Sequence, residues 1–186
     1  INITMGSPLK STAFYSFIDA IFQMQLQNFK NGEPGIYHKN LLKVVNHPLF
    51  ITFVSSEEIL KLRESILESN KINISINEIK YCFSNSFENV RAIFSKWSNT
   101  EESLNLIEYL IKHFRKNLEN QKNNIESEIL YAFNTLFQLL NNLVLQSTFN
   151  TEIKTIHSII QQLVSKEVIP FKGEPLNGIQ IMGILE

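Results

Sequence analysis

The acidic residues are poorly placed for metal binding or acid–base catalysis. The sequence has a single aspartate, Asp19, on a segment rich in phenylalanine, whereas a metal-dependent nuclease needs clustered carboxylates to hold its ion. The pairs Glu57–Glu58 and Glu101–Glu102 lie where helices are expected to begin, and there they favour the helix dipole. We therefore interpret both pairs as structural, and we expect no catalytic residue, no metal site and no cofactor site in this chain.

Histidine and cysteine are also dispersed. The four histidines show no ligand spacing and are expected to be surface or packed residues: His38, His47, His113 and His157. Cys82, the one cysteine, stands between Tyr81 and Phe83 and is most simply a core thiol. Nucleophilic catalysis would need a nearby base and a group that orients it, and the sequence identifies neither.

The features that bear on nucleotides and nucleic acids are weak. No P-loop pattern (G-x-x-x-x-G-K-[ST]) and no dinucleotide fingerprint occurs in the sequence. The stretch "KHFRK" places Lys112, Arg115 and Lys116 on one side of a helix. This side is either a solvated face, which is the default interpretation, or a surface that contacts phosphate. Trp97 is expected to anchor the core, the alternative being a base-stacking platform. A net charge of −1 argues against strong stand-alone binding to duplex DNA.

The elements that must position these residues are mostly helices. Three long amphipathic helices are predicted from about Thr100, Ile125 and Thr151. Each has a stripe of apolar residues along one side, and the helices are expected to bury these stripes against one another in a helical bundle. An earlier helix, capped by Ser11 or Thr12, runs to about Asn28. Shorter helices are predicted over 37–48, 55–70 and 86–97. Residues 71–76 are either a strand or an extended lead-in to a helix capped by Ser75, and we favour the second.

Both ends of the sequence predict strands instead. "INITMG" opens the sequence, and "GIQIMGIL" lies in its last eleven residues. The chain has 186 residues, 44% of them hydrophobic, which fits one globular domain. No apolar run reaches the ~18 residues of a membrane span, and no signal peptide is evident. We therefore expect a cytoplasmic protein with no membrane partner.

Three stretches resemble segments of AddB-like subunits of bacterial helicase–nucleases, which belong with RecB-type helicases and carry a PD-(D/E)XK nuclease domain. The family segment "N-[VI]-[ST]-[ML]-G-x-P-L-x-x-T-P" is matched at Asn2, Ile3, Thr4, Met5, Gly6, Pro8, Leu9 and Thr12. Position 13 departs from it, with Ala where the family often has Pro. "LLKVVNHPLF", residues 41–50, and "PFKGEPLNGIQIMGILE", residues 170–186, are similar to two further family segments. The middle hundred-odd residues match only in being helical.

The resemblance implies a particular place for this chain. In superfamily-one helicases a RecA-like domain, 2A, is interrupted by a helical subdomain, 2B, and resumes at motif V. Residues 1–30 would then belong to 2A, residues 31–168 to a 2B-like insertion, and residues 169–186 to the return strand. Gln180, Gly183 and Glu186 would begin a motif V-like run. ATP and Mg²⁺ are expected only for the parent protein, which engages DNA and an AddA-like partner subunit.

The strands at the two ends carry the sharpest structural expectation. Residues 2–5 and 179–182 are predicted to pair in parallel, covered by Phe14, Phe17 and Ile18 of the first long helix. The outer edges of such a pair would allow the fragment to dimerise. The rival interpretation is a self-contained helical protein-interaction module. A catalytic role for the isolated fragment ranks third.

Overall fold

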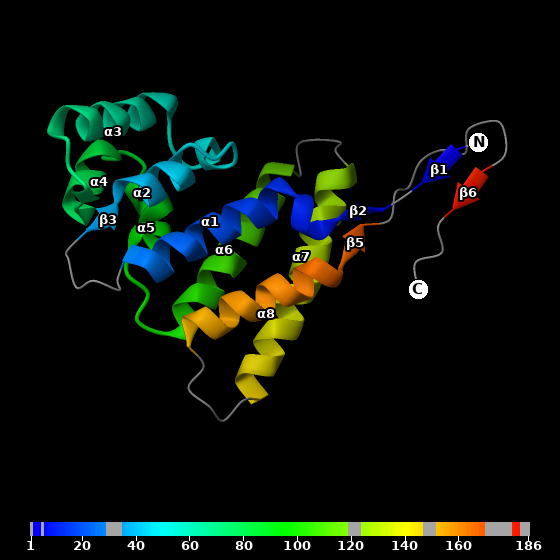
Figure 1. Ribbon diagram of the computed structural model, residues 1–186. Coiled ribbons are helices and arrows are strands. Elements are labelled where there is room, and N and C mark those ends of the chain that lie inside the picture. Colours follow the sequence, from blue (N-terminus) through cyan, green and yellow to red (C-terminus); the bar gives the residue numbers. More distant parts are fainter. Residues whose placement is uncertain are drawn as a thin grey trace.

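The chain is mostly helical. A computed structural model describes residues 2–4, 6–28, 35–118, 124–146, 152–169 and 180–182 (Figure 1). The helices in this part are α1 (Ala13–Asn28), α2 (His38–Val45), α3 (Ser56–Ser69), α4 (Ile76–Cys82), α5 (Phe87–Phe94), α6 (Thr100–Leu118), α7 (Asn124–Gln146) and α8 (Ile153–Lys166). The strands are β1 (Asn2–Thr4), β2 (Ser7–Pro8), β3 (Ile36–Tyr37), β4 (Asn73–Ile74), β5 (Val168–Ile169) and β6 (Gln180–Met182), and there are 3-10 turns at Leu9–Ser11 (η1) and Phe50–Thr52 (η2).

Three two-stranded pairings join distant parts of the sequence. β1 and β6 lie in parallel, with Ile3 opposite Ile181. Figure 1 shows this pair apart from the helices, beyond β2 and β5. β2 pairs with β5 and β3 pairs with β4, both antiparallel. The two antiparallel pairs were not predicted, because strands of two residues are too short to show an alternating pattern.

β2 and β5 fix the start of α1 beside the end of α8. The N–H of Leu9 donates to the carbonyl of Glu167 at 3.0 Å, directly after the strand pair. A Cβ on Gly6 would lie 2.3 Å from a methyl carbon of Val168, so a side chain at this position would force the two segments apart. The entrance and exit of the helical part are therefore held together.

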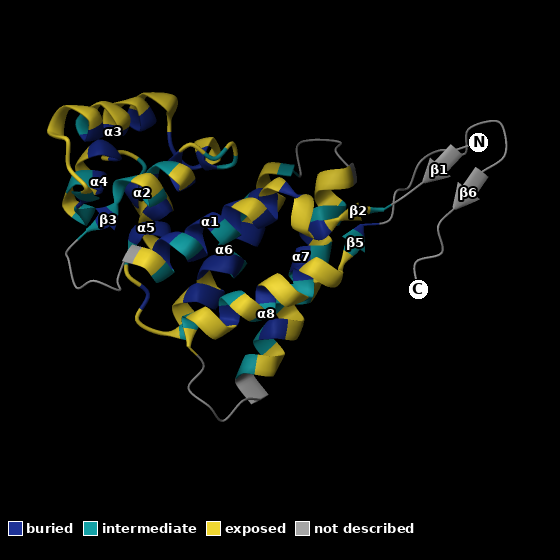
Figure 2. Cartoon of the chain, in the orientation of Figure 1, coloured by how far each residue is buried: buried dark blue, intermediate teal, exposed yellow. Residues whose placement is uncertain are grey.

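Helix α1 lies at the centre of the hydrophobic core. Phe14 packs edge-to-face on Phe114 of α6 and Phe133 of α7, at centroid distances of 5.6 and 4.8 Å. Phe17 lies against Phe53, which follows η2, at 6.2 Å. In Figure 2 the buried residues of α1 and α6 line the interior, while exposed residues run along the outside of α3 and α8. The core thus joins α1 to helices from both halves of the sequence.

This packing corrects one expectation from the sequence. Phe14, Phe17 and Ile18 were predicted to cover the strand pair formed by the two ends. They are buried instead among the helices, where Ile18 faces α7 and α8. The helical spacing of its apolar residues showed that α1 had a face to bury, but it could not show which element covers that face.

Side chains cap the starts of α1, α3 and α4, whereas α2, α5 and α8 begin without a side-chain cap. The Thr12 hydroxyl accepts from the N–H of Tyr15 at 3.3 Å, which places the start of α1 where the sequence predicted it. Ser55 and Ser75 each form a reciprocal capping box with the glutamate three residues later. Residues 71–76 combine the two alternatives weighed for them, because Asn73 and Ile74 form β4 and Ser75 then caps α4.

Candidate functional site

The cationic residues of α6 lie on its exposed side. Lys112, Arg115 and Lys116 are all exposed, as their spacing predicted. The Lys112 ammonium lies 2.6 Å from a carboxylate oxygen of Glu108, one turn earlier, so its charge is partly compensated. Arg115 and Lys116 stand in the last turn, where they also favour the helix dipole. The face is a modest cationic surface and not a deep basic groove.

The motif V-like residues lie elsewhere. Gln180 is the first residue of β6 and stands opposite Asn2 of β1. Gly183 and Glu186 lie outside the described residues. Figure 1 shows β6 well apart from α6, so the structure does not bring Gln180 together with Lys112, Arg115 and Lys116.

The only aspartate of the sequence joins α1 to α8. Asp19 Oδ1 lies 2.8 Å from His157 Nε2 and accepts from the Gln161 amide at 3.3 Å. The His157 ring stacks on Phe22, with the two planes inclined by 11°. Asp19 and His157 are 138 positions apart, so no local pattern in the sequence could reveal their pairing.

This carboxylate–imidazole pair lacks the rest of a catalytic arrangement. A triad needs a nucleophile on the second ring nitrogen of the histidine. Within the described residues, the hydrogen bonds of His157 all involve Nε2, to Asp19 and Gln161. Nearby Tyr15 is buried, and burial together with the Asp19 charge raises the pKa of its phenol. The cluster is best explained as a set of polar contacts that hold α1 against α8.

Ser16 and His47 form a second pair that the sequence did not reveal. Ser16 Oγ lies 2.8 Å from His47 Nε2, and the Leu49 N–H donates to His47 Nδ1 at 3.3 Å. Since Nδ1 accepts, we assign the ring proton to Nε2, which then donates to the serine. Burial lowers the pKa of His47, so the ring is neutral near pH 7. In this tautomer the imidazole does not act as a base toward Ser16.

The remaining reactive and aromatic candidates belong to the core. Cys82 is buried, and burial raises the pKa of its thiol. Trp97 is also buried, packs edge-to-face on Phe22 and donates its indole N–H to the carbonyl of Ala92 at 3.1 Å. Both residues were interpreted as core residues from the sequence, and both interpretations are confirmed. With its ring buried in this way, Trp97 is not placed to stack on a base.

The acidic pairs Glu57–Glu58 and Glu101–Glu102 lie in the first turns of α3 and α6, as expected. Glu58 accepts from the Ser86 hydroxyl at 2.8 Å and from the Asn85 N–H at 3.1 Å, in addition to closing the capping box with Ser55. Burial alone would raise the pKa of Glu58, but these hydrogen bonds outweigh it and hold the pKa below its usual value. At the start of α6, the Glu102 carboxylate accepts from the Ser98 N–H at 2.6 Å.

Two hollows open on the surface. One, of about 410 Å³, lies between α5 and α6 and has Glu88, Lys96 and Glu102 on its rim, with Trp97 and Tyr109 also lining it. The other, of about 270 Å³, lies between the start of α1 and the facing ends of α6 and α7. It is mostly apolar, with residues such as Phe14, Phe114 and Leu130 in its wall.

The described residues also contain no cluster of three or more His, Cys, Asp or Glu side chains that is placed to hold a metal ion. No helix in the described ranges is long and apolar enough to cross a membrane. No family model matches the sequence, and neither a curated protein nor a solved structure is similar enough to be a match. The residues and their arrangement therefore carry what can be inferred about function.

Proposed function

We propose that this chain is a non-catalytic helical accessory region of a DNA double-strand-break repair helicase–nuclease subunit, built as a 2B-like insertion. The observation that supports this most is the parallel register of β1 and β6, with Asn2, Ile3 and Thr4 opposite Gln180, Ile181 and Met182. Parallel neighbours need a crossover connection. In this chain the helices α1 to α8 all lie within that connection.

The proposal assigns a simple mechanical role to the strands. At β1 the chain leaves the 2A sheet of the parent protein, and at β6 it returns to that sheet. The sequences of both strands lie in the segments that resemble AddB-like subunits. The antiparallel β2–β5 pair then acts as a clamp at the base of the insertion, since it joins the start of α1 to the end of α8. ATP and Mg²⁺ belong to the parent protein, and this chain contributes contacts with DNA or with an AddA-like subunit.

For DNA engagement the proposal relies on the exposed cations of α6. Lys112, Arg115 and Lys116 lie within two helical turns and face solvent. With a net charge of −1, the isolated chain is expected to bind single-stranded DNA weakly, at ~10⁻⁴–10⁻⁶ M or weaker at physiological salt. Removal of these three charges should weaken that binding further and reduce its salt dependence.

Fluorescence anisotropy of labelled single-stranded DNA, titrated at several salt concentrations, tests this proposal. The test variant replaces Lys112, Arg115 and Lys116 by alanine. The matched control replaces three exposed lysines on other elements: Lys10, Lys39 and Lys154. The slope of log K against log salt should fall by ~0.7 for each phosphate that the test variant no longer neutralises, and should stay unchanged in the control. An equal decrease in both variants would remove the α6 face from the proposal.

The second candidate function is a self-contained helical protein-interaction module. It is favoured by the hydrophobic core of the described residues, which joins the helices α1 to α8 to one another. The two candidates differ in what the neighbouring polypeptide contains, because an insertion requires an ATPase fold around it and a module does not.

A further inference from the structure

Helix α7 carries two apolar stripes, of which one faces the core and the other is only partly covered. The first packs into the core and consists of Leu130, Phe133, Phe137, Leu140 and Val144. The second, here called the outer stripe, consists of Ile125, Ile129, Ala132, Leu136, Leu139 and Leu143. Its spacing alternates between four and three residues along its whole length, which is the heptad pattern of a coiled-coil seam.

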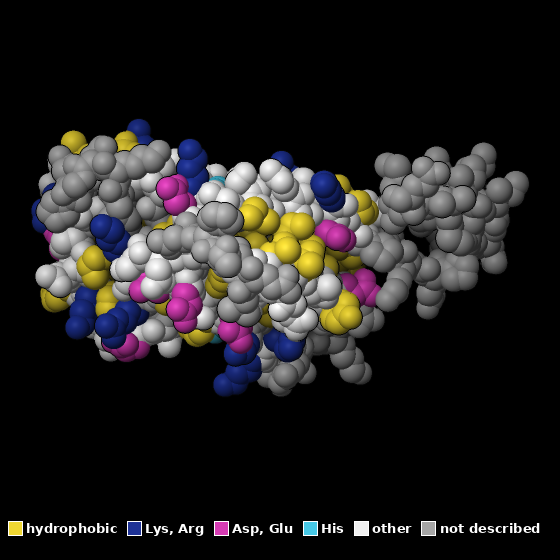
Figure 3. All heavy atoms as spheres, turned by 90° about the horizontal axis from the view of Figure 1, so that it is seen from below, with side chains coloured by type: hydrophobic (Ala, Val, Ile, Leu, Met, Phe, Trp, Pro, Cys, Tyr) yellow, Lys and Arg dark blue, Asp and Glu magenta, His cyan; other side chains and the backbone are white. Residues whose placement is uncertain are grey.

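Half of the outer stripe lies in solvent. Ile125, Leu139 and Leu143 are 57%, 47% and 48% exposed, whereas Ile129, Ala132 and Leu136 are half-buried and pack against the core. In Figure 3 hydrophobic side chains gather near the middle of the face that is seen from below. Contiguous exposed apolar surface of this kind marks an interaction site in a globular protein.

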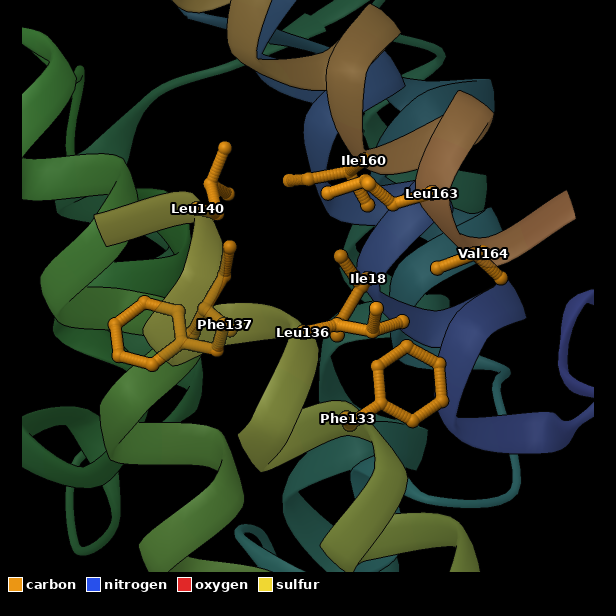
Figure 4. A pocket seen from close by; sticks show the side chains of 9 residues that line it. Ile18, Phe133, Leu136, Phe137, Leu140, Ile160, Leu163 and Val164 are labelled. Atoms are coloured by element: carbon orange, nitrogen blue, oxygen red, sulfur yellow. The ribbon is translucent and has the colours of Figure 1, made fainter. Parts of the chain in front are cut away.

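The stripe continues into a small apolar cavity beside α8. Leu136 and Leu140 of α7 face Ile160 and Leu163 of α8 across a cavity of about 20 Å³ (Figure 4). This volume barely holds one water molecule, so the cavity itself is too small for a ligand. Leu163 lines this cavity together with Leu136 of the outer stripe.

The sequences that form this surface contain few charged residues. That of α7 contains no Asp, Glu, Lys or Arg between residues 129 and 146, and that of α8 contains none between residues 155 and 165. A charged group on the occupant would lose its hydration here without gaining an ion partner, which costs several kcal/mol. An apolar, uncharged surface is therefore the best match for this face, and the outer stripe of α7 is itself such a surface.

We propose that the outer stripe pairs with the same stripe of a second copy of this chain, with the two α7 helices antiparallel. A two-fold axis near Asn134 sets Ile125 opposite Leu143, Ile129 opposite Leu139 and small Ala132 opposite Leu136 of the second copy. All six positions of the stripe are then used, and the interface is isologous.

The flanking residues select the antiparallel direction. Glu128, Thr135 and Asn142 follow one edge of the stripe at intervals of seven residues. In the antiparallel arrangement Glu128 faces Asn142 of the second copy, and the two Thr135 side chains meet near the axis. A parallel arrangement would instead bring the two Glu128 carboxylates to the same end. This inference does not depend on the function proposed above.

Sedimentation velocity and light scattering of the 186-residue chain over a range of concentrations test the pairing. The chain of 21.5 kDa should form a concentration-dependent dimer. Leu139→Glu places two carboxylates in the dimer interface and should weaken self-association by more than ~100-fold, with an unchanged circular dichroism spectrum. Leu67→Glu on α3, where the leucine is 75% exposed, is the matched control and should leave the dimer intact.

Cross-linking then tests the geometry. Thr135→Cys should be linked between copies by a short bismaleimide, whereas Tyr131→Cys, on another side of α7, and the wild-type chain with its buried Cys82 should not. A chain that stays monomeric at every concentration overturns the inference. A dimer that survives Leu139→Glu overturns it as well, and points to pairing through the edges of β1 and β6.

Discussion

Replacement of Glu58 by alanine should destabilise the fold far more than removal of an ordinary surface glutamate. Glu58 is buried, with 8% of its surface exposed. Its carboxylate joins the start of α3 to the turn before α5. Two of its hydrogen bonds reach across 27 and 28 positions, to the Asn85 N–H and the Ser86 hydroxyl. A third interaction closes the capping box with Ser55.

The magnitude follows from these contacts. A hydrogen bond to a charged group contributes ~1.5–3 kcal/mol, and the lower value applies because Asn85 is exposed. At about 1.5 kcal/mol each, the hydrogen bonds from Asn85 and Ser86 together contribute about 3 kcal/mol, so Glu58→Ala should lower the free energy of unfolding by at least this amount. For a chain of this size the melting temperature should fall by about 6–12 °C. Glu57→Ala, in the same helical turn but exposed, removes only a dipole interaction of about 0.3–1 kcal/mol and is the matched control.

The effect should also depend on pH. Since the pKa of Glu58 is lower in the folded state, its carboxylate stabilises the fold above the unfolded pKa of ~4.3, and this contribution is lost as the pH falls through the folded value. The difference between wild type and Glu58→Ala in urea unfolding should therefore shrink between pH 7 and pH 3. A difference from Glu57→Ala of less than ~0.5 kcal/mol at pH 7 would refute this reasoning.

Four further outcomes are expected. Lys71→Ala should raise the pKa of Glu78 from about 2 toward its usual value in an NMR titration, because the Lys71 ammonium is the largest cause of the depression. Gly35→Ala should destabilise the β3–β4 pair by ~1–3 kcal/mol in urea unfolding, because φ is +129° and the new Cβ would lie 2.9 Å from the Ile74 carbonyl oxygen. Phe17→Ala should cost about 3–5 kcal/mol by the same measurement. The purified chain should hydrolyse no ATP above a buffer control when Mg²⁺ and single-stranded DNA are present.

Each of these outcomes has a contrary result. An unchanged Glu78 pKa in Lys71→Ala would mean that hydrogen bonds from Ser75 suffice for the depression. Wild-type stability in Gly35→Ala would show that the backbone at position 35 accepts a side chain without strain, and in Phe17→Ala it would show that the core refills the space. ATP hydrolysis that co-purifies with the chain through several columns would contradict its non-catalytic role.

Local features of this fold could be predicted from the sequence. The caps at Ser55 and Ser75 follow from a serine and a glutamate three residues apart, because both partners lie in one helical turn. The long helices α6, α7 and α8 follow from their apolar periodicity. The core positions of Trp97 and Cys82 follow from their apolar neighbours.

Contacts between distant residues could not be predicted in this way. The pairing of Asp19 with His157 depends on how α1 and α8 cross, and neither residue carries a local signal of it. The same holds for Ser16 and His47. For α7 the sequence shows apolar residues at more than one helical face, but only the packing shows that Phe133 is buried while Leu139 stays exposed.

The central claim is that β1 and β6 are the departure and return strands of a larger sheet. The most direct measurement is to sequence the gene on both sides of the part that encodes residues 1–186. The account predicts an intact or degenerate RecA-like ATPase region upstream and a PD-(D/E)XK nuclease motif downstream, in one open reading frame. An open reading frame that encodes only this chain, or that joins it to unrelated domains, would contradict the claim.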